Sequence, residues 1–193
     1  MDKKQQRQQA YLARNAQVNK EEISAIICQR IIELPEYQQA KTVLWYVHCR
    51  SEVRTLSALS RELQGNRRIV VPYCTVDENG EKCLGLWLLK SIDELQPGMW
   101  NILEPAKTRW QAADRQIQAD ELDLVLVPGV AFDVSGGRLG NGAGYYDRLL
   151  SHVRNDALRL GICYQSQIVS KVVRQAHDVL MDRVITEQAI YSS

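Results

Sequence analysis

Apolar residues recur along the chain at two different periods, and the first segments follow the helical one. Residues 3–16 predict a polar helix. A second helix is expected to begin after Asn19, which would cap it together with Glu22, and to end before Pro35. The apolar positions of this second helix follow a 3.6-residue period and are Ile23, Ile26, Ile27, Ile31 and Leu34.

Short runs of β-branched and aromatic residues predict strands between the helices. Residues 68–76 and 81–89 flank Asn79-Gly80, a type I′ turn signal, and predict a β-hairpin. Strands otherwise alternate with helices, so we expect a three-layer α/β fold: a mostly parallel sheet flanked by helices, with the hairpin as an insertion. The other expected elements are strands at 42–47, 122–127, 158–163 and 184–190, and helices at 55–64, from Tyr146 onward and at 166–173.

Composition narrows the class of protein. The 193 residues are 45% hydrophobic, which fits one domain over residues 1–193. A formal net charge of +1 gives no case for a nucleic-acid or membrane partner, and no apolar run reaches the about 18 residues of a membrane span. The first residues lack the apolar core of a signal peptide, and the five cysteines include no C-x-x-C pair. We therefore expect free thiols and a cytoplasmic location.

The most distinctive segment leads from an apolar strand through a glycine-rich loop into a helix. It reads Pro-Gly-Val-Ala-Phe-Asp from Pro128, then Arg-Leu-Gly-Asn-Gly-Ala-Gly-Tyr-Tyr-Asp from Arg138. Glycine at every second position lets backbone N–H groups face an anion, and the helix N-terminus adds a favourable dipole. Arg138 offers a planar guanidinium to phosphate, and Asp147 can hold a Mg²⁺ ion that bridges phosphate oxygens. The segment predicts a site for a nucleoside polyphosphate with a metal.

Other motifs fit the sequence less well. The spacing G-x-G-x-G is neither the G-x-G-x-x-G of dinucleotide-binding folds nor a P-loop, which needs Gly-Lys-Ser/Thr. A bare run of alternating glycines would be a flexible turn, but here arginine, two tyrosines and aspartate accompany it. A catalytic pair of His48 and Cys49 is unfavourable, because adjacent residues on a strand point to opposite faces.

The glycine-rich segment closely resembles the signature of the 5-formyltetrahydrofolate cyclo-ligase family, also called methenyltetrahydrofolate synthetases. One position departs from the pattern: the family often has Lys between the second and third glycines, where this chain has Ala143. Arg138, Arg148, Lys3 and Arg7 are the candidate substitutes. Four further segments are similar to the family in the same order and extend the resemblance over nearly the whole chain: Lys3 with Arg7, Glu52-Val53-Arg54-Thr55, Trp100-Asn101-Ile102-Leu103-Glu104-Pro105, and His177-Asp178 with Val184-Ile185-Thr186-Glu187.

The resemblance implies an enzyme that cyclises 5-formyltetrahydrofolate to 5,10-methenyltetrahydrofolate. ATP would be the co-substrate, which phosphorylates the formyl oxygen and leaves as ADP and phosphate, and Mg²⁺ the cofactor. The enzyme would be a cytoplasmic monomer. The implied residues are Arg138 and Tyr145 for catalysis; Tyr46, Glu52, Trp100 and Tyr145 for the folate; Asp147 and Asp178 for the metal; and Lys3, Arg7, Arg138, Leu139, Gly140, Asn141, Gly142, Ala143, Gly144, Tyr145 and Tyr146 for ATP.

Several of these residues also have ordinary structural interpretations. Trp100 can cap the core, Tyr46 can pack within it, and Glu52 can be a surface acid. Asp133 can cap a turn or bind metal, and His177-Asp178 can bind metal or stabilise the C-terminal turn.

Two rival functions stay open. One is a regulatory protein of the same fold that binds nucleotide or folate without turnover, an alternative that Ala143 sustains. The other is a phosphosugar isomerase or acyl-CoA transferase, which needs a carboxylate or Lys base that no separate motif supplies.

Overall fold

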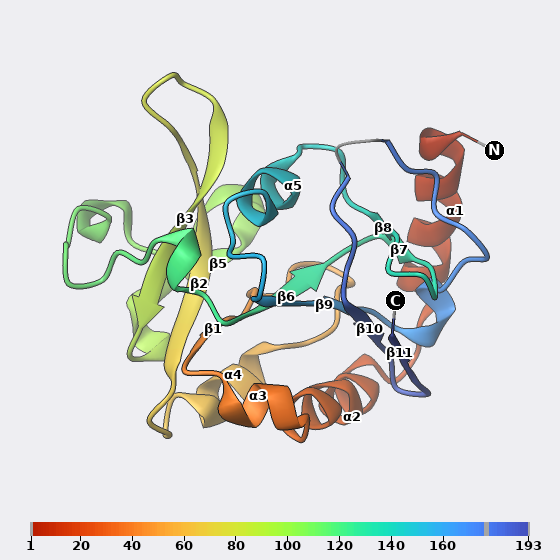
Figure 1. The fold of residues 1–193 in the computed structure, drawn as a ribbon, viewed down its shortest axis with the longest axis horizontal. Coiled ribbons are helices and arrows are strands. Elements are labelled where there is room, and N and C mark those ends of the chain that lie inside the picture. Colours follow the sequence, from red (N-terminus) through yellow and green to blue (C-terminus); the bar gives the residue numbers. More distant parts are fainter. Residues whose placement is uncertain (1, 176–177, 193) are drawn as a thin grey trace.

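The computed structural model describes residues 2–175 and 178–192. One seven-stranded sheet forms its middle, in the order β11–β10–β9–β6–β1–β2–β3 (Figure 1). The five inner strands are parallel, and an antiparallel strand closes each edge. The predicted mostly parallel sheet is therefore confirmed. The strands are β1 (Thr42–Leu44), β2 (Arg68–Val76), β3 (Lys82–Leu89), β6 (Leu124–Pro128), β9 (Leu158–Ile162), β10 (Arg183–Ile185) and β11 (Ile190–Ser192).

Helices cover both faces of this sheet, as predicted for three layers. In Figure 1, α2 (Lys20–Ile32), α3 (Pro35–Gln39) and α4 (Leu56–Glu62) lie below the sheet, and the short α5 (Tyr145–Leu150) lies above it. The first helix, α1 (Lys3–Ala16), stands at one end beside β7 (Ala131–Phe132), which pairs with β8 (Arg138–Leu139). No described helix is both long and apolar enough for a membrane span.

The sheet is buried on both faces because successive apolar residues of each strand enter different layers. Val43 and Trp45 pack with α2 and α4 in one cluster, whereas Leu44 packs with Leu149 and Leu150 of α5 in another. Near-continuous apolar runs such as Leu124–Val127 are the consequence, and they are what made these strands recognisable in the sequence.

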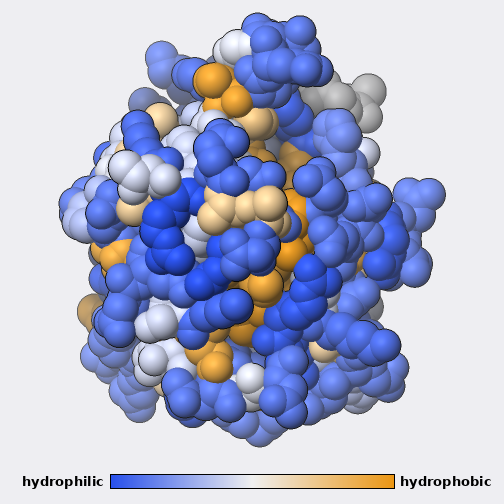
Figure 2. Space-filling model, turned by 90° about the vertical axis from the view of Figure 1, so that its left-hand side faces the viewer, coloured by the Kyte–Doolittle hydropathy of each residue, from blue (hydrophilic) through white to orange (hydrophobic). Residues whose placement is uncertain are grey.

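A small ribbon and several 3-10 turns lie between β3 and β6. The ribbon consists of β4 (Leu95–Pro97) and β5 (Leu103–Pro105), joined by the turn η2 (Met99–Asn101). The remaining turns are η1 (Ile92–Glu94), η3 (Lys107–Arg109), η4 (Ala119–Glu121) and, after β9, η5 (Gln165–Gln167). On this side of the molecule, apolar surface shows in hollows between polar side chains (Figure 2). Met99 and Trp100 of η2 are exposed apolar side chains, as is Val76 at the end of β2.

Some element boundaries differ from the prediction, each for a local reason. Asn19 has a left-handed backbone (φ 51°) and makes no side-chain cap, so the predicted capping box is wrong. Ile26 is exposed rather than buried. Asn79 keeps a negative φ, and only Gly80 is left-handed, so the hairpin turn is not type I′. Pro35 does not merely stop a helix but also starts α3.

The C-terminal part shows the largest differences. The predicted helix 166–173 is limited to η5, after which the chain is extended and its backbone bonds to side chains of other elements. The predicted strand 184–190 is two strands, β10 and β11, paired as a hairpin. Gln188 and Ala189 donate their N–H groups to the Thr186 hydroxyl, and these bonds form the turn that splits the run.

Candidate active site

A cavity of 310 Å³ lies beyond the carboxyl ends of β1 and β6, the usual place for ligands in such sheets. Tyr46 and Arg50 come from the segment that follows β1, and Gly129 follows β6. Tyr73 of β2 and Trp100 of the β4–β5 turn line another part of its wall. Residues far apart in sequence therefore surround one space.

The glycine-rich loop forms one wall of this cavity, and α1 holds it from behind. Gly142 (φ 94°) and Gly144 (φ 75°) have left-handed backbones, which glycine adopts without a steric cost. The Arg7 Nε donates to the Gly140 carbonyl at 2.9 Å, and the Tyr11 hydroxyl donates to the Asn141 side chain. These contacts fix the loop so that its backbone borders the cavity.

Arg138 is buried at the edge of the loop with donor capacity to spare. One guanidinium nitrogen, Nη2, donates to Asp147 Oδ1 at 2.6 Å, and Nη1 reaches the Pro128 carbonyl at 3.4 Å. The Nε is buried and has no partner among the described residues. Arg138 also lines the cavity, so its guanidinium charge suits an incoming oxyanion.

Glu52 is a second buried charge, and the interpretation as a surface acid is wrong. Its Oε2 accepts from the Cys49 N–H at 3.0 Å, and its Oε1 lies 3.7 Å from Arg14 Nη1. Burial raises the pKa of Glu52 above its ordinary value, and these two contacts oppose that shift. A carboxylate held this way can accept the N–H donors of an amino-pyrimidine ring.

Two aromatic rings pack edge to face on the cavity wall. The Trp100 and Tyr145 ring centroids lie 6.1 Å apart at an interplanar angle of 82°. Trp100 is 53% exposed, so it does not cap the core. Tyr46 is buried, as its packing interpretation expects, and it also lines the cavity, while its hydroxyl donates to the Val53 carbonyl at 3.2 Å. The arrangement offers flat apolar faces to a ring.

The sequence model of the 5-formyltetrahydrofolate cyclo-ligase family matches residues 1–187. The chain belongs to this family. The resemblance inferred from the glycine-rich segment is thereby confirmed.

Individual relatives of the family agree in sequence and fold. An Arabidopsis thaliana protein named mitochondrial 5-formyltetrahydrofolate cyclo-ligase is 32% identical over 184 residues, which cover 85% of this chain and 65% of the relative. The cyclo-ligase of Mycolicibacterium smegmatis is 31% identical over 146 residues, or 76% and 73% of the two chains. The NMR structure of Aquifex aeolicus 5,10-methenyltetrahydrofolate synthetase superposes with a TM-score of 0.83 at 29% identity, covering 100% of this chain and 93% of that one.

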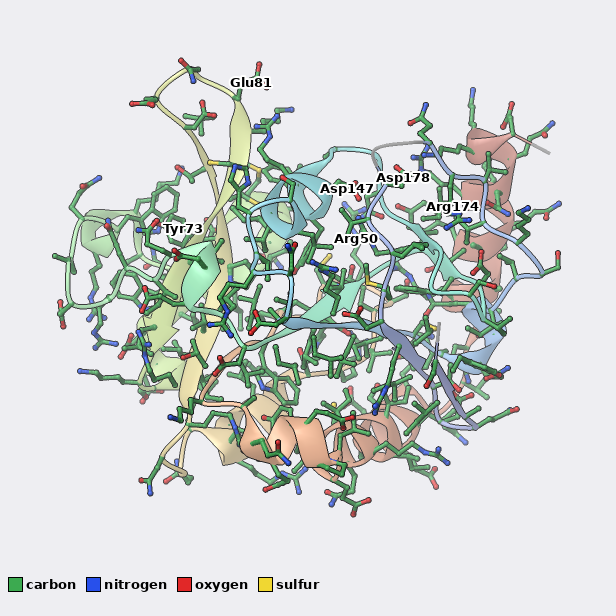
Figure 3. The ribbon with its side chains drawn as sticks, viewed as in Figure 1. Arg50, Tyr73, Glu81, Asp147, Arg174 and Asp178 are labelled. Atoms are coloured by element: carbon green, nitrogen blue, oxygen red, sulfur yellow. The ribbon has the colours of Figure 1, made fainter. Side chains whose placement is uncertain are left out.

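Most residues that the family resemblance singled out line the cavity, but four do not. Leu139 is buried in a small cluster beside α1, and Arg7 lies behind the loop. Lys3 pairs with Asp178 at 2.7 Å, and neither residue is part of the cavity wall. Figure 3 shows Asp178 on the segment between α5 and α1. The metal role of Asp178 thus stays a prediction, and its neighbour His177 lies outside the described residues.

Asp133 settles one of the open alternatives. Its carboxylate accepts from the N–H groups of Ser135 and Gly137 at 2.9 Å and of Val172 at 2.8 Å. These three bonds engage both carboxylate oxygens with backbone N–H groups, so the side chain caps a turn. Within the described ranges, no group of three His, Cys, Asp or Glu side chains gathers to hold a metal by itself.

The prediction missed several lining residues, of which Arg50 and Glu104 carry charge. Glu104 stands within a quoted family motif, so that motif was the signal that could have found it. No sequence pattern predicts that Arg50 lines the cavity. It has a left-handed backbone (φ 50°), which arginine rarely adopts and which no local motif indicates here.

Cys74 also lines the cavity, where burial and then Glu104 raise its pKa to about 11. Its thiol is protonated near neutral pH and is no nucleophile.

Proposed function

We propose that this chain catalyses the ATP-dependent cyclisation of 5-formyltetrahydrofolate to 5,10-methenyltetrahydrofolate. The observation that carries the proposal is the division of the cavity into two kinds of wall. The Arg138 guanidinium and the glycine-rich loop, which both line the cavity, suit phosphates. Trp100, Tyr145 and the buried Glu52 suit a polar aromatic ring such as a pterin.

The chemistry needs positioning rather than a covalent nucleophile on the protein. The formyl oxygen attacks the γ-phosphorus, an O–P bond forms, and the bond to the ADP oxygen breaks. N10 then attacks the activated carbon and loses its proton as the C–O bond breaks and phosphate leaves. The protein must hold the formyl oxygen in line with the γ-phosphorus and neutralise the developing charge, and we assign the second task to the Arg138 guanidinium.

Tyr145 would act as a hydrogen-bond donor in this scheme. Burial raises its pKa, and nearby Cys74 raises it further, so the hydroxyl keeps its proton near neutral pH. A protonated phenol can donate to the formyl or phosphoryl oxygen but cannot serve as a base.

The family often has a lysine at the position of Ala143, and we assign the role of that lysine to Arg50. Both Arg50 and Ala143 line the cavity, and no described residue forms a hydrogen bond or ion pair with the Arg50 guanidinium. Of the substitutes expected from the sequence, Lys3, Arg7 and Arg148 do not line the cavity, and Arg148 donates at 2.9 Å to Glu81, which lies on the hairpin of β2 and β3 (Figure 3). The Arg50 charge also lowers the pKa of nearby Glu52, but its N–H donors have no described acceptor and can serve a phosphate.

The residues present fit a magnesium ion at the phosphate end. Mg²⁺ in phosphate-transfer sites takes one or two carboxylates and completes its shell with water and phosphate oxygens. The half-exposed Asp147 carboxylate on the cavity wall is such a ligand. When bound, the ion would offset phosphate charge, while Arg138 orients the Asp147 carboxylate.

The near-ultraviolet absorbance of the methenyl product tests the proposal. The wild-type protein should produce it only with 5-formyltetrahydrofolate, ATP and Mg²⁺ together. We expect Arg138→Ala to lower kcat by about 100-fold, the order of magnitude for losing one electrostatic contact to a transition state. Arg148→Ala, which removes an arginine outside the cavity, is the matched control and should leave turnover unchanged.

A rival outcome is equally clear. Thermal stabilisation by ATP or folate without product would favour the regulatory binding protein instead. A monomeric state and a cytoplasmic location are further parts of our proposal, and sedimentation and cell fractionation test them.

A further inference from the structure

The turn that carries Trp100 has an unusual backbone. Trp100 (φ 56°) and the next residue, Asn101 (φ 61°), are both left-handed, and neither is glycine. A bulky side chain rarely adopts this conformation, and it persists only where surrounding contacts impose it. The Trp100 ring is itself half exposed, so burial of the ring does not impose it.

Glu104 supplies the contact that holds this turn. Its carboxylate is buried on β5, and Oε1 accepts from the Met99 N–H at 3.4 Å, next to Trp100. Oε2 accepts from the Cys74 N–H of β2 at 3.3 Å. Because β1 ends at Leu44, opposite Val70, the later part of β2 has no strand on that side, and Glu104 provides an acceptor there. The carboxylate thus ties the Trp100 turn to the central sheet.

Gly98 makes room for this carboxylate. A Cβ atom at position 98 would lie 2.0 Å from Glu104 Oε1 and 2.1 Å from its carboxyl carbon. The φ of Gly98 is −116°, so the need for glycine here is close approach and not backbone conformation. A methyl group at this position would displace the carboxylate without removing any charge.

We propose that Glu104 is a positioning residue which, seated against Gly98, holds Trp100 edge to face against Tyr145 on the cavity wall and thereby sets the affinity for the folate ring. This inference rests on the proposed function for its substrate. It makes Glu104 act through Trp100 and not by touching the nucleotide.

A double-mutant cycle tests this dependence. Glu104→Ala and Gly98→Ala should each raise KM for 5-formyltetrahydrofolate by about ten-fold, the effect of losing a hydrogen bond or two, and leave KM for ATP unchanged. Trp100→Ala should also raise the folate KM. The double variant with Glu104→Ala and Trp100→Ala should match Trp100→Ala alone, because Glu104 then has nothing left to position.

A matched control separates positioning from loosening of the fold. Glu94 is another mostly buried carboxylate, bonded to Arg115 at 3.0 Å and to Trp87 at 3.0 Å, and it does not line the cavity. Glu94→Ala should lower the melting temperature but keep the folate KM.

Three results would overturn the inference: an unchanged folate KM in both Glu104→Ala and Gly98→Ala, additive effects in the double variant, or equal changes in both substrates. If Glu104→Ala does not fold, Gly98→Ala and Glu104→Gln carry the same comparison. If the wild type makes no product, the folate affinity of each variant, measured by tryptophan fluorescence, replaces KM. A failed enzyme proposal and a failed positioning role then give different results.

Discussion

Arg50 combines a rare backbone conformation with an unpaired charge at the cavity. If it contacts phosphate, Arg50→Gln should raise KM for ATP by roughly ten-fold or more, since hydrogen bonds to charged groups contribute about 1.5–3 kcal/mol. KM for 5-formyltetrahydrofolate should stay the same. The control Arg148→Gln should change neither of these two KM values. Steady-state kinetics with each substrate varied in turn gives the answer. A rise in the folate KM alone would instead assign Arg50 to the substrate's carboxylates.

Glu52 gives the molecule a specific pH dependence. Burial raises its folded-state pKa above the ordinary 4.5, so the native protein holds this proton more tightly than the unfolded chain. Stability is therefore fullest below the ordinary pKa and declines as the pH rises through the raised value. Glu52→Gln should lack this part of the decline in urea unfolding measured across that range. Identical pH profiles for wild type and variant would show that Arg14 cancels the burial cost.

Among single residues, those with one distinctive chemical property could be assigned to the site from the sequence. The glycines, Arg138 and Asp147 stand in a pattern whose purpose can be read locally, and the structure brings them to one cavity. The places of Arg50 and Glu104 depend on other features. Arg50 has a rare backbone angle, and the partner of Glu104, Cys74, lies 30 residues away in the sequence. Local pattern does not carry such information.

Among the elements, α1 connects the chain's start to the glycine-rich loop through mainly polar contacts. Its buried residues are Gln6, Ala10 and Arg14. Gln6 donates to the Lys171 carbonyl at 2.7 Å, and Arg14 donates to Ser51 at 3.0 Å. An element with so little buried apolar surface opens at low free-energy cost.

Hydrogen exchange should therefore find α1 less protected than the inner strands. ATP with Mg²⁺ should slow exchange in α1, because Arg7 and Tyr11 tie it to the loop that binds phosphate. The strand β9 offers an internal control, since it lies in the same sheet but does not line the cavity. Exchange in α1 as slow as in β9 without ligand would contradict this expectation.

The elements that could be predicted are those with a strong local signal. The hairpin of β2 and β3 has alternating runs around a glycine turn, and its strands match the prediction within one residue. The segment 166–173 has helical spacing but is extended, because the Val172 and Val173 N–H groups bond to Asp133 and Gln6. These hydrogen bonds to distant side chains outweigh the local helix propensity of the segment.

For the whole molecule, the cavity joins the first helix, the central strands and the glycine-rich loop, so ligands that fill it should stabilise the entire fold. A ligand at about 100 times its Kd adds about 2.7 kcal/mol. At about 2–4 °C per kcal/mol for a chain of this size, the melting temperature should rise by roughly 5–10 °C.

Arg138→Ala offers a way to separate the two ends of the cavity. The variant should lose most of the shift caused by ATP with Mg²⁺ but keep the shift caused by 5-formyltetrahydrofolate, because Glu52, Trp100 and Tyr145 are unchanged. Calorimetry with each ligand alone measures both shifts. Loss of both shifts would mean that Arg138 organises the cavity as a whole, and loss of neither would place the phosphates elsewhere.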